Sequence, residues 1–254
     1  MEICFFILGT FFGSFYHVVG YRMTKNESII FPRSHCPKCK HVLKPWELIP
    51  VFSYLFGRGK CRKCKNKISW IYPFSEILCG LVFMLCYLSF GFSLELIIAL
   101  TFASMLIIIV FSDIYYMIIE DKVLIVFGVL LIIQIFFIKG FNVLLSSLLS
   151  GLIAFVIMLL IKLGGDFAFK KESMGGGDIK LMFIIGMVIG WQMAIFSIPL
   201  AAIFALPLSL IVLYLKKDRE IPFGPFLGLA SMVILLTKLD FNIITDFMNR
   251  IMGI

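Results

Sequence analysis

Charged residues are scarce in this sequence of 254 residues, and almost none of them lies in the middle of its long apolar runs. Asp, Glu, Lys and Arg make up 15% of the chain, whereas hydrophobic residues make up 61%. Because a soluble domain of ordinary composition has about 45–50% apolar residues, this composition excludes a soluble globular protein and predicts a polytopic membrane protein. The near absence of ionisable residues from the middle of the runs, together with the absence of repeated halves, argues against a transporter.

The apolar runs predict an all-α protein with about eight transmembrane helices, since a membrane span needs about 20 mostly apolar residues. The expected spans cover residues 3–20, 74–91, 94–112, 122–138, 142–162, 178–190, 192–215 and 223–239. The run at 178–190 is short, and little separates it from the next run, so seven or nine spans are alternatives. We divide the chain into a first helix (1–20), a loop (21–73) and a membrane core (74–254).

The first loop predicts the orientation of the chain. Residues 21–73 contain twelve of the 23 Lys and Arg residues and only two acids, and such loops stay in the cytoplasm. The first span lacks a basic segment before it and a small-residue cleavage site after it, so we expect a retained anchor with its N-terminus outside. Threading eight spans from there puts residues 113–121, 163–177 and 216–222 on the cytoplasmic side. We attribute the net charge of +8 to this topology and to membrane lipid, and expect no nucleic-acid binding.

The same loop contains two Cys-x-x-Cys pairs with 21 residues between them. Each pair forms a tight turn that directs two thiolates toward one metal ion, and four thiolates complete a tetrahedral structural zinc site. The predicted ligands are Cys36, Cys39, Cys61 and Cys64. Two disulfides or a redox dithiol, which a reducing cytoplasm disfavours, and free thiols are the alternatives. Because the loop is too short to fold on apolar burial alone, the metal would supply the missing folding energy.

The sequence also predicts where the three remaining cysteines and the apolar residues of the loop lie. Cys4, Cys79 and Cys86 lie in predicted spans and are expected to be small core residues. The apolar loop residues either form a small core or press against the membrane surface; they are Phe31, Leu43, Trp46, Ile49, Val51, Phe52 and Leu55.

Two aspartates stand out among the fifteen acids. Asp113 lies at the cytoplasmic end of the third predicted span, and Asp121 follows eight residues later. Asp178 comes directly after three consecutive glycines, residues 175–177, and the predicted topology puts it on the same side as Asp113 and at a similar depth. Two facing carboxylates can share one proton, so that one activates a water molecule and the other polarises a carbonyl group. The pair is therefore a candidate catalytic dyad.

The glycines fit the same interpretation, although simpler alternatives exist. Glycine lets an extended peptide lie close to the backbone of an enzyme, and a helix that begins near Asp178 directs free N–H groups at the carboxylate. Alternatively, Asp178 only caps a helix after a glycine-rich turn. Asp113 could likewise be a boundary carboxylate that pairs with Lys122 or Lys180.

These motifs, taken in order, resemble those of the type IV prepilin peptidases. The segment GGGDIKL (residues 175–181) is similar to the GxGD signature of membrane aspartyl proteases, and Asp113 followed by Asp121 resembles the first aspartate motif of that family. The paired cysteines after the first span, the GSF and PWELIPVFSYL segments, and IPFGPFLGLA at residues 221–230 are similar to those of its bifunctional members. The resemblance covers nearly the whole chain.

The resemblance implies a multi-pass enzyme of the bacterial inner membrane that cleaves the leader of type IV prepilin, pseudopilin or competence pilin precursors on the cytoplasmic side, after a glycine. It implies Asp113 and Asp178 as the catalytic pair. We add four supporting residues beside the pair: Gly175, Gly177, Asp121 and Lys180. Many members then methylate the new N-terminal amine with S-adenosylmethionine. No glycine-rich nucleotide fingerprint is present, so no residues are predicted for that cofactor.

The chain departs from the family pattern at two places. The family often has Pro-Asp where this chain has Glu120-Asp121, which adds a carboxylate near the site, and it usually has Asn where this chain has His17. An inactive membrane scaffold whose zinc loop binds a partner is one alternative function. A GxGD protease of another branch is a second, against which the two Cys-x-x-Cys pairs argue. The sequence predicts no oligomeric state.

Overall fold

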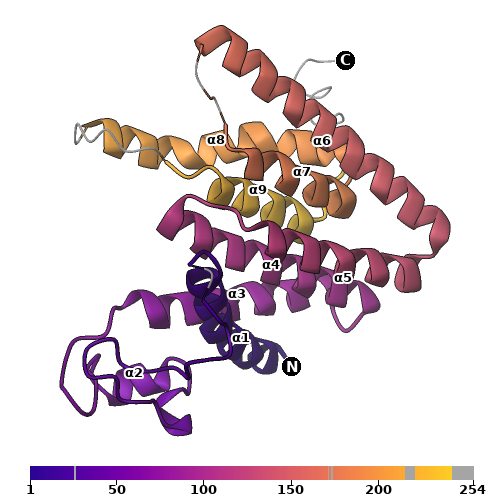
Figure 1. Ribbon diagram of the computed structural model, residues 1–254. Helices are drawn as coiled ribbons and strands as arrows, with labels where there is room; N and C mark the ends of the chain where they lie inside the picture. Colours follow the sequence, from indigo (N-terminus) through magenta and orange to yellow (C-terminus); the bar gives the residue numbers. More distant parts are fainter. Residues whose placement is uncertain (26, 171, 173, 215–220, 242–254) are drawn as a thin grey trace. The chain divides into compact units, whose positions relative to one another are not determined.

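The computed structural model describes residues 1–25, 27–170, 172, 174–214 and 221–241, which form helices and loops but, within this part of the chain, no β-strand. The predicted all-α class is therefore confirmed (Figure 1). In chain order the elements are α1 (Glu2–Met23), the 3-10 helix η1 (Pro45–Glu47), α2 (Phe52–Phe56), α3 (Ile71–Phe90), α4 (Leu94–Tyr116), α5 (Asp121–Lys139), α6 (Phe141–Phe169), α7 (Gly176–Ile189), α8 (Trp191–Tyr214) and α9 (Gly224–Thr237).

Each of the eight predicted spans corresponds to one apolar helix. Six of these helices, α1, α3, α4, α5, α6 and α8, are long and apolar enough to cross a membrane, so the chain is a multi-pass membrane protein. The helices α7 and α9 have 14 residues each, and α7 begins inside the glycine-rich stretch. At 1.5 Å per residue each is about 21 Å long, shorter than the roughly 30 Å of hydrocarbon that a full span crosses. Residues 26, 171, 173 and 215–220, which belong to predicted spans or predicted cytoplasmic segments, lie outside the described residues.

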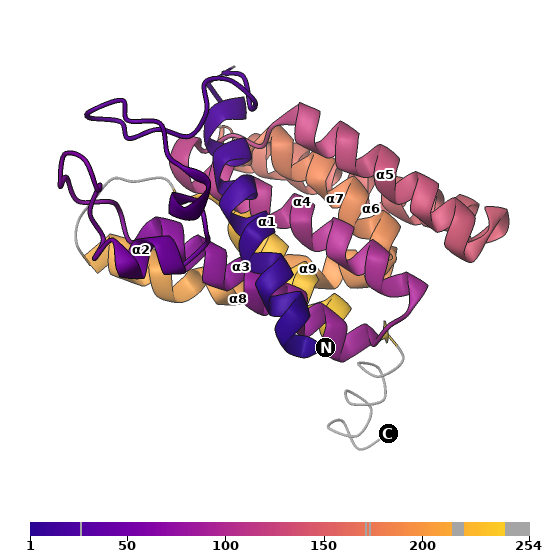
Figure 2. The ribbon, with the colours of Figure 1, turned by 90° about the horizontal axis from the view of Figure 1, so that it is seen from below.

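The chain divides into two compact units, one up to Leu96 and the other from Ile97 onward. In the first unit α1 and α3 lie side by side (Figure 2). Gly9 and Gly13 of α1 form a G-x-x-x-G motif against α3, where an added Cβ on either glycine would lie 2.7 Å from an atom of Cys79. Small residues at such a spacing let membrane helices approach closely.

The three cysteines of the membrane helices differ in their burial. Cys79 and Cys86 are fully buried, which confirms them as small core residues, because α3 presents both to its packed side. Cys4 is exposed, so the same prediction is wrong for that residue. It lies near the start of α1 on a side of the helix that other residues do not cover.

The described residues of the loop between α1 and α3 form no apolar core. Leu43 and Val51 are half-buried, but the other apolar residues expected to form that core are 41–70% exposed: Phe31, Trp46, Ile49, Phe52 and Leu55. Of the two alternatives for these five residues, a small core is therefore wrong, and contact with the membrane surface stays a prediction. Instead, the start of α2 is tied to α3, since the Val51 N–H donates a hydrogen bond to the buried carboxylate of Glu76 at 2.6 Å.

In the second unit α4 supplies much of the core, with buried side chains such as Phe102, Met105 and Ile109. The helices α6 and α7 approach closely, because an added Cβ on Gly186 would lie 2.6 Å from the Cβ of Ala154. The helix α7 also packs against α5, α8 and α9. This packing fixes the first turn of α7, which carries Asp178.

Candidate active site and metal centre

The end of α4 and the start of α7 each contribute one buried aspartate. Asp113 lies in the last turn of α4 and is 5% exposed, and Asp178 lies in the first turn of α7 and is 8% exposed. Their carboxylates are close enough to interact electrostatically. Ionising two carboxylates that are buried near each other is costly, so a pair of this kind can share one proton. The two aspartates singled out in the sequence thus lie in one site.

The glycines before Asp178 have separate structural roles. Gly175 is the N-cap residue of α7, so Asp178 is the third residue of the helix and not its cap. The capping alternative for Asp178 is therefore wrong. An added Cβ on Gly177 would lie 2.7 Å from the Cβ of Ile119, in the loop between α4 and α5, whereas an added Cβ on Gly176 would meet nothing within 4 Å. Gly177 is needed for close packing of this loop against α7.

The hydrogen-bonding capacity of the Asp178 carboxylate is only partly used by the described residues. Its Oδ1 atom is buried and, among the described residues, has no hydrogen-bond partner. A buried polar atom without a partner is costly and is common where a site awaits water or a ligand. This atom is a candidate for contact with a reacting group.

A third element, the start of α9, completes the site. The Gly224 N–H donates a hydrogen bond to the carboxylate of Asp113. An added Cβ on Gly224 would lie 2.6 Å from Oδ2 of Asp113 and 3.3 Å from Cδ1 of Ile119, so only glycine fits. The free N–H groups at a helix start suit a carboxylate partner. The sequence alone predicts no role for Gly224 beside Asp113, although a glycine followed by Pro225 before an apolar run is typical of a helix start.

Asp121 and Lys180 form an ion pair with each other. The Lys180 Nζ donates to both carboxylate oxygens of Asp121, at 2.7 and 2.8 Å, and both side chains are more than half exposed. The alternative in which Lys180 pairs with Asp113 is therefore wrong. An exposed pair of this kind stabilises a protein by about 0.2–1 kcal/mol. Its structural effect is to connect the start of α5 to α7 next to the buried pair.

The four cysteines of the first loop come together in the first unit. All four Sγ atoms lie within 4.8 Å of one another. In the first turn the Cys36 N–H donates to the His41 carbonyl and the Lys40 N–H donates to the Cys36 carbonyl, and the second turn repeats both bonds around Cys61. Across the two turns the Sγ atoms of Cys36 and Cys64 are 3.8 Å apart and those of Cys39 and Cys61 are 3.9 Å apart, far beyond the 2.05 Å of a disulfide. The cysteines are free thiols arranged around one point.

The electrostatics of these turns favour metal binding. The backbone N–H groups of Cys39 and Lys38 hydrogen-bond to the Cys36 sulfur and lower the pKa of its thiol to about 6. The corresponding N–H groups of the second turn, those of Cys64 and Lys63, lower the pKa of Cys61. Since the thiolate is the metal ligand, these turns prepare Cys36 and Cys61 to bind a cation, whereas burial and the neighbouring sulfur atoms raise the pKa of Cys64 to about 11. The four-cysteine cluster can therefore hold a metal ion.

Glu47 connects the two cysteine turns. Its side chain is 8% exposed, and its carboxylate oxygens lie 3.3 Å from Nε2 of His41 and 3.8 Å from Nε of Arg62. It also accepts the Lys44 N–H at 2.9 Å. This N–H first, and then the two basic side chains, lower the pKa of Glu47, so it carries a negative charge between the turns.

Comparison with known proteins relates both sites to one family. Residues 7–90 match the family described as Bacterial Peptidase A24 N-terminal domain, and residues 100–210 match the Type IV leader peptidase family. The prepilin leader peptidase/N-methyltransferase of Bacillus subtilis (strain 168) is 36% identical over 232 residues, which cover 90% of this chain and 91% of the relative. The chain belongs to the type IV leader peptidase family.

Other family members are similar over the same extent. The proteins of that name from Stutzerimonas stutzeri and Pseudomonas aeruginosa are 31% and 30% identical, over 92% of this chain and 90% and 89% of the relatives. The match at 7–90 includes the cysteine cluster, and the match at 100–210 includes both buried aspartates, whereas Gly224 lies beyond it. No solved structure matches the chain.

Proposed function

We propose that the protein is a membrane aspartic endopeptidase whose acid–base pair is Asp113 and Asp178. The observation that supports this proposal is the burial of two interacting carboxylates at the ends of α4 and α7. With one proton shared between them, the ionised carboxylate takes a proton from a water molecule, and the protonated one donates a hydrogen bond to the carbonyl oxygen of the scissile peptide bond. The water oxygen then adds to the carbonyl carbon, and no covalent enzyme intermediate is needed.

The tetrahedral intermediate collapses when a proton reaches the leaving nitrogen. The carboxylic acid formed by the first proton transfer donates this proton, so the C–N bond breaks and the pair returns to its singly protonated state. The Gly224 N–H holds the carboxylate of Asp113 in place during both steps. Orientation of this kind matters because an error of about 1 Å in position can cost on the order of a hundredfold in rate.

The short helices α7 and α9 suggest where the cleavage takes place. If the C-terminal end of α7 reaches the outer boundary of the hydrocarbon, its 21 Å length leaves the first turn roughly 10 Å inside the cytoplasmic boundary. Asp178, in that first turn, would then lie in a recess that opens toward the cytoplasm. Such a recess suits a substrate that is itself anchored in the membrane and crosses the cytoplasmic surface.

The proposed substrates are precursors of type IV pilins and related proteins. The support for this proposal is that the relatives are named prepilin leader peptidase/N-methyltransferase. We propose that the enzyme works in a bacterial inner membrane and cleaves the leader on the cytoplasmic side, after a glycine.

We further propose that the protein methylates the new N-terminal amine. The names of the relatives include N-methyltransferase, and S-adenosylmethionine is the proposed donor. The amine nitrogen would take the methyl group from the sulfonium and release a proton. We assign no residues to this step.

The proposed metal of the cysteine cluster is zinc, in a structural role. With Zn–S bonds of about 2.3 Å, the sulfur atoms of a regular tetrahedron lie about 3.8 Å apart. The two sulfur pairs Cys36–Cys64 and Cys39–Cys61, at 3.8 and 3.9 Å, fit this geometry. Four thiolates leave no position for water or substrate, so zinc here stabilises the loop and takes no part in peptide cleavage.

The purified full chain, incubated with a synthetic prepilin leader peptide that extends past the cleavage site, tests the proposal. Mass spectrometry should find one cut after the glycine, and labelled S-adenosylmethionine should transfer its methyl group to the new N-terminus. A peptide supplied already cleaved should be methylated directly. Failure to cut any prepilin sequence, by a folded and metal-loaded protein in lipid, would contradict the proteolytic function.

A further inference from the structure

The short helix α2 begins close to the membrane surface. Val51, directly before α2, donates its N–H to Glu76, the sixth residue of α3. Five residues of helix correspond to about 8 Å, so this bond lies within two turns of the start of α3. Because α3 is a membrane-spanning helix, its start lies at the cytoplasmic boundary, and α2 is held beside that boundary. The backbone of Val51 has φ of +61°, which is rare for a β-branched residue and shows that its surroundings fix it there.

Apolar side chains cover one side of α2 and remain exposed. Phe52, Leu55 and Phe56 follow the i, i+3, i+4 spacing of one helix side, and they are 59%, 62% and 78% exposed. Trp46 and Trp70 nearby in the chain are 52% and 64% exposed. Aromatic side chains gather at membrane–water interfaces, where their rings lie among the headgroups. At this depth the apolar side of α2 suits the interface between headgroups and acyl chains.

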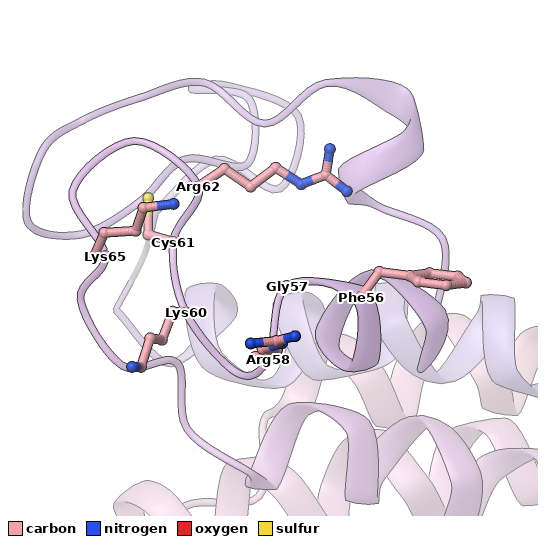
Figure 3. A pocket seen from close by; sticks show the side chains of 7 residues that line it. All are labelled: Phe56, Gly57, Arg58, Lys60, Cys61, Arg62 and Lys65. Atoms are coloured by element: carbon pink, nitrogen blue, oxygen red, sulfur yellow. The ribbon is translucent and has the colours of Figure 1, made fainter.

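A basic hollow of about 240 Å³ lies next to this apolar side (Figure 3). Phe56, Gly57 and Cys61 line it together with four exposed basic side chains: Arg58, Lys60, Arg62 and Lys65. None of its seven lining residues is acidic. The carboxylate of Glu47 lies near only one of the four cations, 3.8 Å from Nε of Arg62. The hollow therefore offers a strongly positive site that an anion would occupy.

We propose that this hollow binds the phosphate of an anionic phospholipid, while Phe52, Leu55 and Phe56 insert between the neighbouring lipids. The occupant follows from three properties that occur together: the depth of α2, its exposed apolar side, and a cluster of cations beside it. A basic residue near an anionic membrane surface strengthens binding about fivefold. The positive hollow repels a basic leader peptide and the sulfonium of S-adenosylmethionine. This lipid site does not depend on the proteolytic function.

The test places a fluorescent reporter at the apolar side of α2 in the full-length protein. Phe56→Trp, in a chain whose three native tryptophans are changed to Phe, is reconstituted into vesicles of mixed phosphatidylcholine and phosphatidylglycerol. In one series the phosphatidylglycerol carries bromine on its acyl chains, and in the other the phosphatidylcholine does, at equal total bromine. Bromine quenches tryptophan on contact, so the ratio of quenching in the two series reports which lipid lies beside α2.

Two variants with equal loss of charge separate the hollow from the general basic character of the loop. The test variant removes three of its cations: Arg58→Gln, Lys60→Gln and Lys65→Gln. The control removes three cations of the same loop that do not line it: Lys38→Gln, Lys63→Gln and Lys67→Gln. Metal content and solubility in mild detergent check that both variants fold.

We expect stronger quenching by brominated phosphatidylglycerol, a preference that the test variant loses and the control keeps. Equal quenching by both lipids in the reporter protein that keeps all four cations of the hollow would overturn the proposal. Absence of quenching would also overturn it, because α2 would then not touch lipid. Equal loss in the test and control variants would show a diffuse charge effect and no site. If inorganic phosphate, added at matched ionic strength, removed the preference, the ligand would be a free phosphate compound and not a lipid.

Discussion

Changing Gly177 to alanine should damage the candidate active site by a predictable displacement. The added Cβ would lie 2.7 Å from the Cβ of Ile119, whereas two carbon atoms in ordinary contact are about 3.5 Å apart or more. The first turn of α7 and the loop that carries Ile119 must therefore separate by roughly 0.8 Å. Asp178 is the next residue in this turn, and Ile119 also packs near Gly224, which holds Asp113. The separation thus moves one carboxylate relative to the other.

A displacement near 1 Å can reduce the rate by on the order of a hundredfold. We therefore expect kcat/KM for a prepilin leader peptide to fall about ten- to a hundredfold in Gly177→Ala, with a loss of about 1–3 kcal/mol in the free energy of unfolding from overpacking. The measurement is cleavage by the purified variant in lipid, followed over time by mass spectrometry.

Gly176→Ala is the matched control, because an added Cβ there meets nothing within 4 Å. Its cleavage rate should stay within about twofold, as for a substitution in open space. If both variants lost activity equally, the glycines would serve the approach of the substrate and not the packing against Ile119. If Gly177→Ala cleaved at the normal rate, the packing argument would be refuted.

Three further predictions concern the surroundings of the two sites. The purified protein should contain about one zinc per chain, the capacity of one four-cysteine site, and Cys36→Ser with Cys61→Ser should release it; metal analysis of freshly reduced protein without zinc would contradict the assignment. Asp121→Asn should slow cleavage less than a change in the buried pair does. Lys180→Gln should slow cleavage to the same extent, and the double variant should be no slower, because each change breaks the same exposed ion pair. Gly224→Ala should reduce kcat for the leader peptide, since the added Cβ would lie 2.6 Å from Oδ2 of Asp113; an unchanged kcat would show that this contact does not orient the carboxylate.

Much of the fold could be predicted from two sequence patterns, the apolar runs and the spacing of the cysteines. Eight apolar runs gave the eight apolar helices in order, because hydrophobic length is a strong signal in membrane proteins. The spacing of the two Cys-x-x-Cys pairs predicted the four-cysteine cluster, since each pair forms a local turn. In both cases the information lies within a short stretch of the chain.

Features that depend on contacts between distant segments could not be predicted in the same way. The N–H of Gly224 contacts Asp113, which lies more than 100 residues earlier in the chain, and no local sequence pattern predicts that contact. The need for glycine at 177 arises from Ile119, which the sequence does not distinguish from other apolar residues. The exposure of Phe52 and Leu55 could not be predicted because an apolar pattern has the same form for a core and for a membrane surface.

The exchange of each buried aspartate for asparagine tests the central claim most directly. Asparagine keeps the size of the side chain but cannot exchange a proton, so Asp113→Asn and Asp178→Asn should each reduce leader cleavage at least about a hundredfold, the contribution expected of a general acid or base. Both variants should remain inserted in the membrane and loaded with metal. The double variant should be no worse than either single one, because the two residues act as a unit. Methylation of a peptide supplied already cleaved should survive both changes if it uses a separate site. Cleavage at a near-normal rate by Asp178→Asn would contradict the aspartyl mechanism.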